Sequence, residues 1–115
     1  MDFFAQVTSG RLPVTTLVVT NRVIAFLHPE PFFEEHVVVI PRKSIPSLTR
    51  AAKSDESILV AVLGVVARVA RDVEERWGGC HIETRCGTYQ TEPHLHFTVT
   101  AGERLRTPDG APIQR

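Results

Sequence analysis

The chain has 115 residues, 43% of them hydrophobic, which is the size and composition of one folded domain with its own core. Its 13 basic and 13 acidic residues cancel, and this balance argues against a nucleic-acid or anionic-membrane surface, because both need an excess of Lys and Arg. The longest apolar run, residues 58–67, is too short to span a bilayer. Cys80 and Cys86 would lie about 20 Å apart on one extended strand, too far for a disulfide. Two free thiols in a reducing cytoplasm are the expectation.

The first quarter of the chain predicts a short helix and a hairpin. Residues 2–8 form the expected helix, which ends at a Ser-Gly pair. Residues 15–20 and 23–27 are β-branched or apolar runs on either side of Asn21-Arg22. That pattern is typical of two antiparallel strands joined by a tight turn.

The next segment predicts a break and then a buried strand. Residues 28–31 (HPEP) contain two prolines, which interrupt regular pairing. Residues 36–40 (HVVVI) form a continuous apolar run that Pro41 ends.

Residues 58–77 predict a long helix, because apolar side chains recur every three or four positions. Ser54 and Asp55 offer N-caps, and Gly78-Gly79 ends the helix. The part from 58 to 67 carries no charge on any face. A helix that lies on a sheet should keep one face in water, so this uncharged stretch favours a subunit interface over a helix covered by another segment.

The last two predicted strands are residues 81–85 and 94–100. The order of elements indicates an α+β domain with a mostly antiparallel sheet of about five strands, one long helix and a short N-terminal helix. We expect the domain to span residues 1–103 and to be followed by a loosely held polar tail, 104–115.

Residues 93–100 (PHLHFTVT) carry the strongest sign of function. In a strand, residues two apart point to the same face. The alternation therefore separates a polar face from an apolar one: His94, His96 and Thr98 against Leu95, Phe97 and Val99. Imidazole exchanges protons, attacks electrophiles or binds metal near neutral pH.

Three interpretations of this row are open. His94 and His96, with His36, could bind zinc, but neither a Cys-x-x-Cys pair nor a suitably spaced carboxylate accompanies them. One imidazole could instead attack phosphorus while a neighbour fixes its tautomer. In the third interpretation the histidines and the loop 87–91 bind a phosphate without chemistry.

Several segments, taken in order, resemble the histidine triad (HIT) superfamily, closest to its Hint-like branch, over about residues 3–101. The triad segment is 93–99, compared with the family pattern His-φ-His-φ-His-φ-φ, where φ is apolar. The other matching segments are Gln90-Thr91, 22–27 (RVIAFL), 36–43 (HVVVIPRK) and 9–13 (SGRLP).

The resemblance implies a site for a purine nucleoside monophosphate or its conjugates, and a homodimer through the helix around Ile58-Trp77. It makes His96 the nucleophile that forms a nucleotidyl-imidazole intermediate, with His36 as an additional histidine that orders the site. The implied phosphate contacts are Gln90, Thr91 and His94. The implied base pocket is Phe4, Leu12, Phe26 and Pro29, although Phe26 and Leu12 could equally be core residues and Pro29 a turn residue.

Three positions depart from the family pattern. Thr98 replaces the third histidine and carries no positive charge, so it stabilises a transition state less, because charge-assisted hydrogen bonds are about twice as strong as neutral ones. His28 stands where an acidic residue holds the ribose hydroxyls, and Glu83 replaces an asparagine near the ribose. No metal or other cofactor is expected, because Asp2, Ala5 and Ser44 stand where some relatives carry zinc ligands.

The sequence thus predicts a HIT-type hydrolase or nucleotidyl transferase that cleaves at the α-phosphate of a nucleoside phosphoramidate, ester or dinucleoside polyphosphate. The alternative is a catalytically weak or inactive nucleotide-binding protein on the same scaffold.

Overall fold

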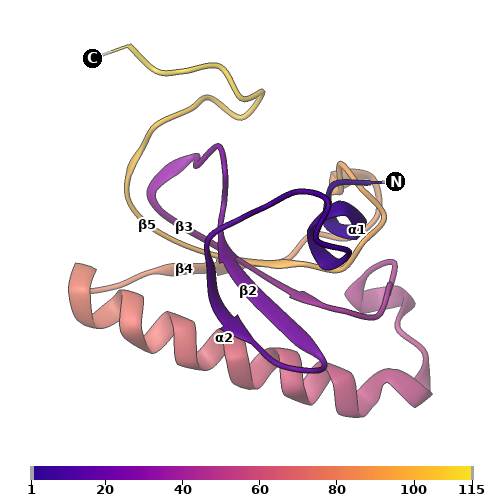
Figure 1. Cartoon of the computed structure of the whole chain (residues 1–115). Helices are drawn as coiled ribbons and strands as arrows, with labels where there is room; N and C mark the ends of the chain where they lie inside the picture. Colours follow the sequence, from indigo (N-terminus) through magenta and orange to yellow (C-terminus); the bar gives the residue numbers. More distant parts are fainter. Residues whose placement is uncertain (1, 115) are drawn as a thin grey trace.

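The computed structural model describes residues 2–114 and contains a five-stranded antiparallel sheet with one helix on each face (Figure 1). The helices are α1 (Phe3–Thr8) and α2 (Glu56–Trp77). The strands are β1 (Thr16–Val19), β2 (Val23–Leu27), β3 (Phe33–Pro41), β4 (His81–Glu83) and β5 (Phe97–Arg104). They lie in the order β1-β2-β3-β5-β4, and every neighbouring pair is antiparallel. The predicted fold class is confirmed.

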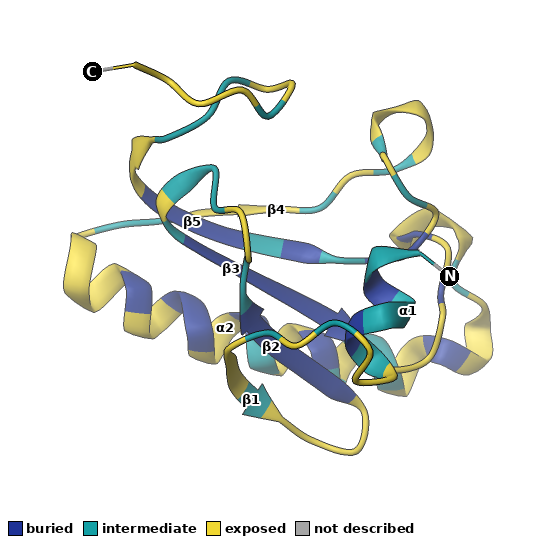
Figure 2. Ribbon diagram, turned by 45° about the horizontal axis from the view of Figure 1, so that its top comes forward, coloured by how far each residue is buried: buried dark blue, intermediate teal, exposed yellow. Residues whose placement is uncertain are grey.

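The apolar runs of β2 and β3 are continuous because both faces of these strands are buried (Figure 2). One face packs against α2 and the other against α1. The cluster under α2 includes Val23, Ala25, Val37, Val39, Val62, Val66 and Val73. The cluster under α1 consists of Phe4, Val7, Ile24, Phe26, Val38 and Ile40. The second cluster supports the site described below.

Helix α2 begins earlier than the periodicity predicted, at Glu56, after two 3-10 turns, Leu48–Arg50 and Lys53–Asp55. Asp55 occupies the N-cap position, but its side chain makes no capping bond to the helix. Its carboxylate instead accepts from the Ala52 amide and from Lys43 Nζ, at 2.9 and 2.6 Å. The prediction of a side-chain cap was therefore wrong, whereas Gly78 ends the helix as predicted, with φ +83°.

The outer face of α2 is exposed over the stretch without charges. Val62 and Val66 face the sheet and are buried, while Val60 and Leu63 are 71% and 51% exposed. Among residues 2–114 no other segment covers this face, so the alternative of a helix beneath another segment is wrong.

Beyond the expected end of the domain, β5 includes Arg104 and the tail starts by continuing the sheet. The Leu105 amide donates to the Phe32 carbonyl at 2.7 Å, and Arg106 forms an isolated antiparallel β-bridge with Pro112. The tail thus folds back on itself. None of the helices in the described part of the chain has the length and hydropathy needed to span a membrane.

Candidate active site

His94 and His96 lie in the irregular segment that leads into β5, and not within the strand itself. The predicted strand 94–100 was wrong at its start, because β5 begins at Phe97. The amides of this segment bond elsewhere: Leu95 N donates to the Ile45 carbonyl at 2.6 Å, and His94 N to Glu92 O at 2.9 Å. The alternation of faces persists, since Leu95 packs in the cluster under α2 and His96 contacts Phe4 of α1.

The geometry of His96 prepares one ring nitrogen for attack. Its Nδ1 lies 3.0 Å from the His94 carbonyl oxygen. A carbonyl only accepts, so Nδ1 carries the proton and Nε2 keeps its lone pair. The ring stacks on Phe4 with 4.6 Å between centroids. Burial lowers the pKa of His96 below 6.5, which keeps the ring neutral at physiological pH.

His94 is a buried imidazole without a hydrogen-bond partner. It is 2% exposed, and neither ring nitrogen bonds to any residue in the range 2–114. Burying an unsatisfied polar group costs about 1–3 kcal/mol. Its ring lies 5.2 Å from that of Phe4, beside His96. The neutral ring therefore has one unpaired donor and one unpaired acceptor, and only the protonated nitrogen can bond to an acceptor such as a phosphoryl oxygen.

A second pair of imidazoles, His28 and His36, lies with ring centroids 4.5 Å apart. Each Nδ1 accepts a backbone N–H at 3.0 Å, from Glu30 and from Phe32 respectively. Each Nε2 therefore carries the proton and is a donor. Burial, with His28 and His96 nearby, lowers the pKa of His36 to about 4, and burial also lowers that of His28.

The loop before the triad segment is anchored by Gln90. The Gln90 side-chain amide donates to the Pro46 carbonyl at 2.9 Å, whereas Thr91 is exposed. A phosphate contact from the Gln90 amide would require this bond to be released.

Thr98 and Glu83 face each other across β4 and β5. The Thr98 side chain is half-buried. Glu83 is exposed and its carboxylate bonds to Arg85 Nε at 3.0 Å. Any contact between Glu83 and a ligand would compete with that ion pair.

The residues expected to line the base pocket separate into different environments. Phe4 lies directly on the two triad imidazoles. Phe26 is fully buried in the cluster under α1, and Leu12 packs against that cluster. Pro29 is exposed after β2. The structure thus joins Phe4 to His94 and His96, while Phe26 lies in the core.

Sequence reasoning missed three neighbours of these imidazoles. The Phe3 ring stacks on His28 with centroids 5.9 Å apart. The charge of Arg85 lowers the pKa of His96 and that of Glu92 raises it, so both lie within its electrostatic range. Glu92 could have been noticed, because it is the only acidic residue between positions 83 and 103.

Within residues 2–114, no group of three or more His, Cys, Asp or Glu side chains is arranged to hold a metal ion. Cys80 and Cys86 are both free thiols.

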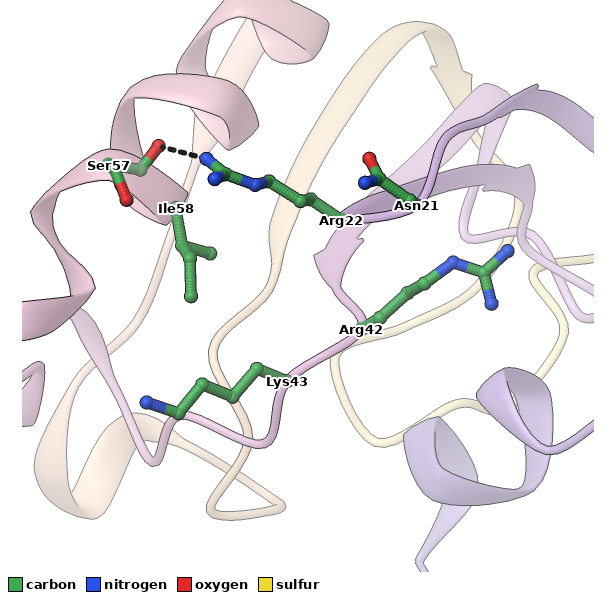
Figure 3. A pocket seen from close by; sticks show the side chains of 6 residues that line it. All are labelled: Asn21, Arg22, Arg42, Lys43, Ser57 and Ile58. Atoms are coloured by element: carbon green, nitrogen blue, oxygen red, sulfur yellow. Dashed lines mark hydrogen bonds between the residues drawn. The ribbon is translucent and has the colours of Figure 1, made fainter.

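A separate pocket of about 210 Å³ lies at the other end of β2 and β3 (Figure 3). Arg22 donates to the Ser57 carbonyl, Arg42 to the Thr20 carbonyl, and Lys43 pairs with Asp55. In Figure 3 the guanidinium of Arg42 points away from the charged ends of Arg22 and Lys43. This pocket therefore has no converging groups, unlike the imidazole site.

The antiparallel sheet with a helix on each face defines an α+β protein. Its site is centred on two histidines that lie just before the last strand begins. The chain belongs to the family of HIT domain proteins, whose pattern matches residues 9–105.

Known proteins resemble the chain over most of its length. A 13.2 kDa HIT-like protein from Azospirillum brasilense is 30% identical and matches 90% of this chain and 88% of its own length. A HIT family hydrolase from Clostridium thermocellum superposes with a TM-score of 0.76 at 30% identity, over 87% of this chain and 89% of that one. A histidine triad nucleotide-binding protein from Candida albicans shares the fold, with a TM-score of 0.74 at 22% identity over 86% and 73% of the two chains.

Proposed function

We propose that this protein is a nucleotidyl-transferring hydrolase that cleaves a purine nucleoside phosphoramidate, ester or dinucleoside polyphosphate at the α-phosphate, with His96 as nucleophile. The observation that carries the proposal is the His96 tautomer, because the His94 carbonyl holds the proton on Nδ1 and leaves the Nε2 lone pair free. The Clostridium thermocellum relative is described as a hydrolase and the Candida albicans relative as nucleotide-binding. The first description supports hydrolysis, and the second supports a nucleotide as the bound molecule.

The reaction would proceed in two displacements. In the first, a bond forms from His96 Nε2 to the α-phosphorus, and the bond from phosphorus to the leaving group breaks with its electron pair on the departing atom. In the second, water attacks phosphorus, the P–N bond to His96 breaks with its pair on Nε2, and the proton from water passes to solvent. The products are the nucleoside monophosphate and the regenerated imidazole.

The other side chains would bind and orient the phosphoryl group. His94, whose nitrogens are buried and unpartnered, and the Thr91 hydroxyl supply donors close to the triad segment. His36 and His28 present Nε2–H groups. Thr98 adds at most one neutral hydrogen bond, so less charge is stabilised than by an imidazolium.

A trapped covalent adduct tests the proposal. Brief exposure to a nucleoside phosphoramidate, followed by denaturation at alkaline pH and peptide mass spectrometry without an acid step, should add the mass of a nucleoside monophosphate to the peptide that contains His96. The adduct should be absent from a His96→Asn variant prepared in parallel.

The second candidate function is nucleotide binding without turnover. Binding without turnover is favoured by Thr98, because its side chain cannot carry a positive charge. It is also favoured by the hydrogen bond from the Gln90 amide to the Pro46 carbonyl, which occupies that amide. In that case the same experiment shows no adduct, while the nucleoside monophosphate still binds in a calorimetric titration.

The exposed apolar face of α2 supports a homodimer as a further part of the proposal. We expect light scattering after size exclusion to give twice the 12.8 kDa mass of one chain. Leu63→Arg should restore the monomer mass, because it buries a charge in the interface. Leu17→Arg is the matched control, since Leu17 is 48% exposed on β1 and should leave the dimer intact. A parent protein of monomer mass would refute the dimer.

Cys80 and Cys86, both free, are consistent with the cytoplasmic location that we propose.

A further inference from the structure

The C-terminal tail closes into a hairpin, residues 105–113, which we call the tail hairpin. The Ile113 amide donates to the Leu105 carbonyl at 3.0 Å, and at the tip the Gly110 amide donates to the Thr107 carbonyl at 2.8 Å. Gly110 has φ +95°, a conformation that favours glycine. The tail hairpin therefore has hydrogen bonds and a turn of its own, and is not a loose extension of β5.

The tail hairpin contacts the domain at Phe32, through both the backbone and the ring of this residue. At the base of the hairpin, the Leu105 amide donates to the Phe32 carbonyl at 2.7 Å. At the tip, a Cβ added to Gly110 would lie 3.8 Å from Phe32 Cζ, so the turn lies close to the outer end of the ring. The position of Phe32 thus depends on the shape of the tail hairpin.

Phe32 in turn contacts the second imidazole pair. Its amide donates to His36 Nδ1 at 3.0 Å, which leaves the proton of the neutral ring on Nε2. Its ring meets both imidazoles edge-on, with centroids 5.9 Å from His36 and 5.7 Å from His28. Phe32 therefore sets the tautomer of His36 with its backbone and packs against both imidazoles with its side chain.

We propose that Phe32 is a positioning residue of the imidazole site, and that the tail hairpin holds it in place. The amide and the carbonyl of one residue are separated by only two backbone torsions, so the bond from Leu105 to the Phe32 carbonyl restricts the direction of the Phe32 amide. Phe32 acts through His36 and His28, and not on the substrate. Its effect on turnover rests on the function proposed above, whereas its effect on His36 does not.

The charges around the pair define what release of Phe32 should do. Burial lowers the pKa of His36 to about 4, and the positive charges of His28 and His96 add to this effect. Burial also lowers the pKa of His28, which Glu30 raises, while His96 and Arg106 of the tail hairpin lower it. Because burial is the largest cause for both, loss of the packing over the pair should raise both pKa values.

Two substitutions in the full chain interrupt these contacts at different points. Phe32→Leu keeps the backbone amide and removes the ring that packs against both imidazoles. Gly110→Val leaves Phe32 intact but places a β-branched side chain at a positive φ, so the tip must rearrange beside the ring. Ala111→Val is the matched control, because it puts the same side chain in the same hairpin at an exposed position without a positive φ.

The experiment records the ¹⁵N NMR signals of the histidine rings over a pH titration, which give the tautomer and the pKa of each imidazole. His36→Gln, which lacks these signals, assigns those of His36. In the parent the proton of His36 should lie on Nε2 and its pKa should be about 4. In Phe32→Leu and Gly110→Val both tautomers should be populated, and the pKa of His36 should rise toward 6.5. Ala111→Val should match the parent.

His96 is the internal control, because the His94 carbonyl holds its Nδ1 proton and its tautomer should stay the same in every variant. A change of tautomer at His96 as well as at His36 would indicate general loosening of the site and would overturn the proposal. A parental tautomer and pKa of His36 in Gly110→Val would overturn the role of the tail hairpin. The same result in Phe32→Leu would overturn that of Phe32.

Turnover provides the second measurement. We expect kcat/KM for an adenosine 5′-phosphoramidate to fall roughly tenfold in Phe32→Leu and Gly110→Val, as misplacement of binding groups near a reacting centre does, and to stay at the parental value in Ala111→Val. A parent without turnover would overturn the proposed function but not the positioning of His36, which the NMR titration measures separately. Altered NMR signals of His36 with parental kcat/KM would overturn a role of Phe32 in the reaction.

Discussion

Substitution of His96 by alanine should abolish turnover, with kcat/KM for a nucleoside phosphoramidate reduced by at least about 10⁴-fold, as expected when a covalent nucleophile is removed. The Nε2 lone pair that the His94 carbonyl leaves free is removed together with the ring. Steady-state kinetics on the purified variant, with circular dichroism to verify the fold, measures the effect.

The matched control is His81→Ala, which removes an exposed imidazole on β4 and should leave kcat/KM unchanged. Because His96 also stacks on Phe4, His96→Asn provides a smaller change of shape and should be equally inactive. Parental activity in a folded His96→Ala protein would show that another group attacks phosphorus.

The sequence predicted which residues share a face better than where the strand begins. The alternation in 93–100 correctly separated Leu95 and Phe97 from His96, because burial enforces it. The same pattern cannot show that Leu95 N pairs with Ile45 and not with a neighbouring strand. That pairing depends on a contact 50 residues away in sequence, which periodicity does not encode.

In the site, too, the sequence predicted some features and could not predict others. Residue types and order predicted His94 and His96 as a pair, and the structure adds the tautomers, which depend on carbonyls and amides that no motif reveals. Phe26 illustrates the opposite case: a residue in a family segment is fully buried between α1 and the sheet. The buried oxygen of Glu92 follows from how α1 lies against the loop, a tertiary feature absent from any local pattern.

Acidification should destabilise the protein through His36. Burial next to His28 and His96 lowers the pKa of His36 from 6.5 to about 4 in the folded state. Between these values the unfolded chain binds more protons than the folded one, so stability is complete above pH 6.5 and falls as the pH drops toward 4. At about 1.4 kcal/mol per pKa unit, the loss between pH 7 and 4.5 should be about 2–3 kcal/mol.

The loss should also reach the site, because Nδ1 of His36 can accept the Phe32 amide only while it is unprotonated. Denaturant titrations at pH 7, 6, 5 and 4.5 measure the free energy of unfolding. The hydrogen bond from Lys43 lowers the pKa of Asp55, so protonation of this folded carboxylate lies below the pH range of the titrations. His36→Gln retains an acceptor without the titration and should lose most of the pH dependence, whereas His81→Gln, at an exposed imidazole, should keep it. Parallel pH profiles for the parent and His36→Gln would mean that His36 is not the group that couples stability to pH. Because burial also lowers the pKa values of His28 and His96, any dependence left in His36→Gln should have the same sign, with stability falling as the pH falls.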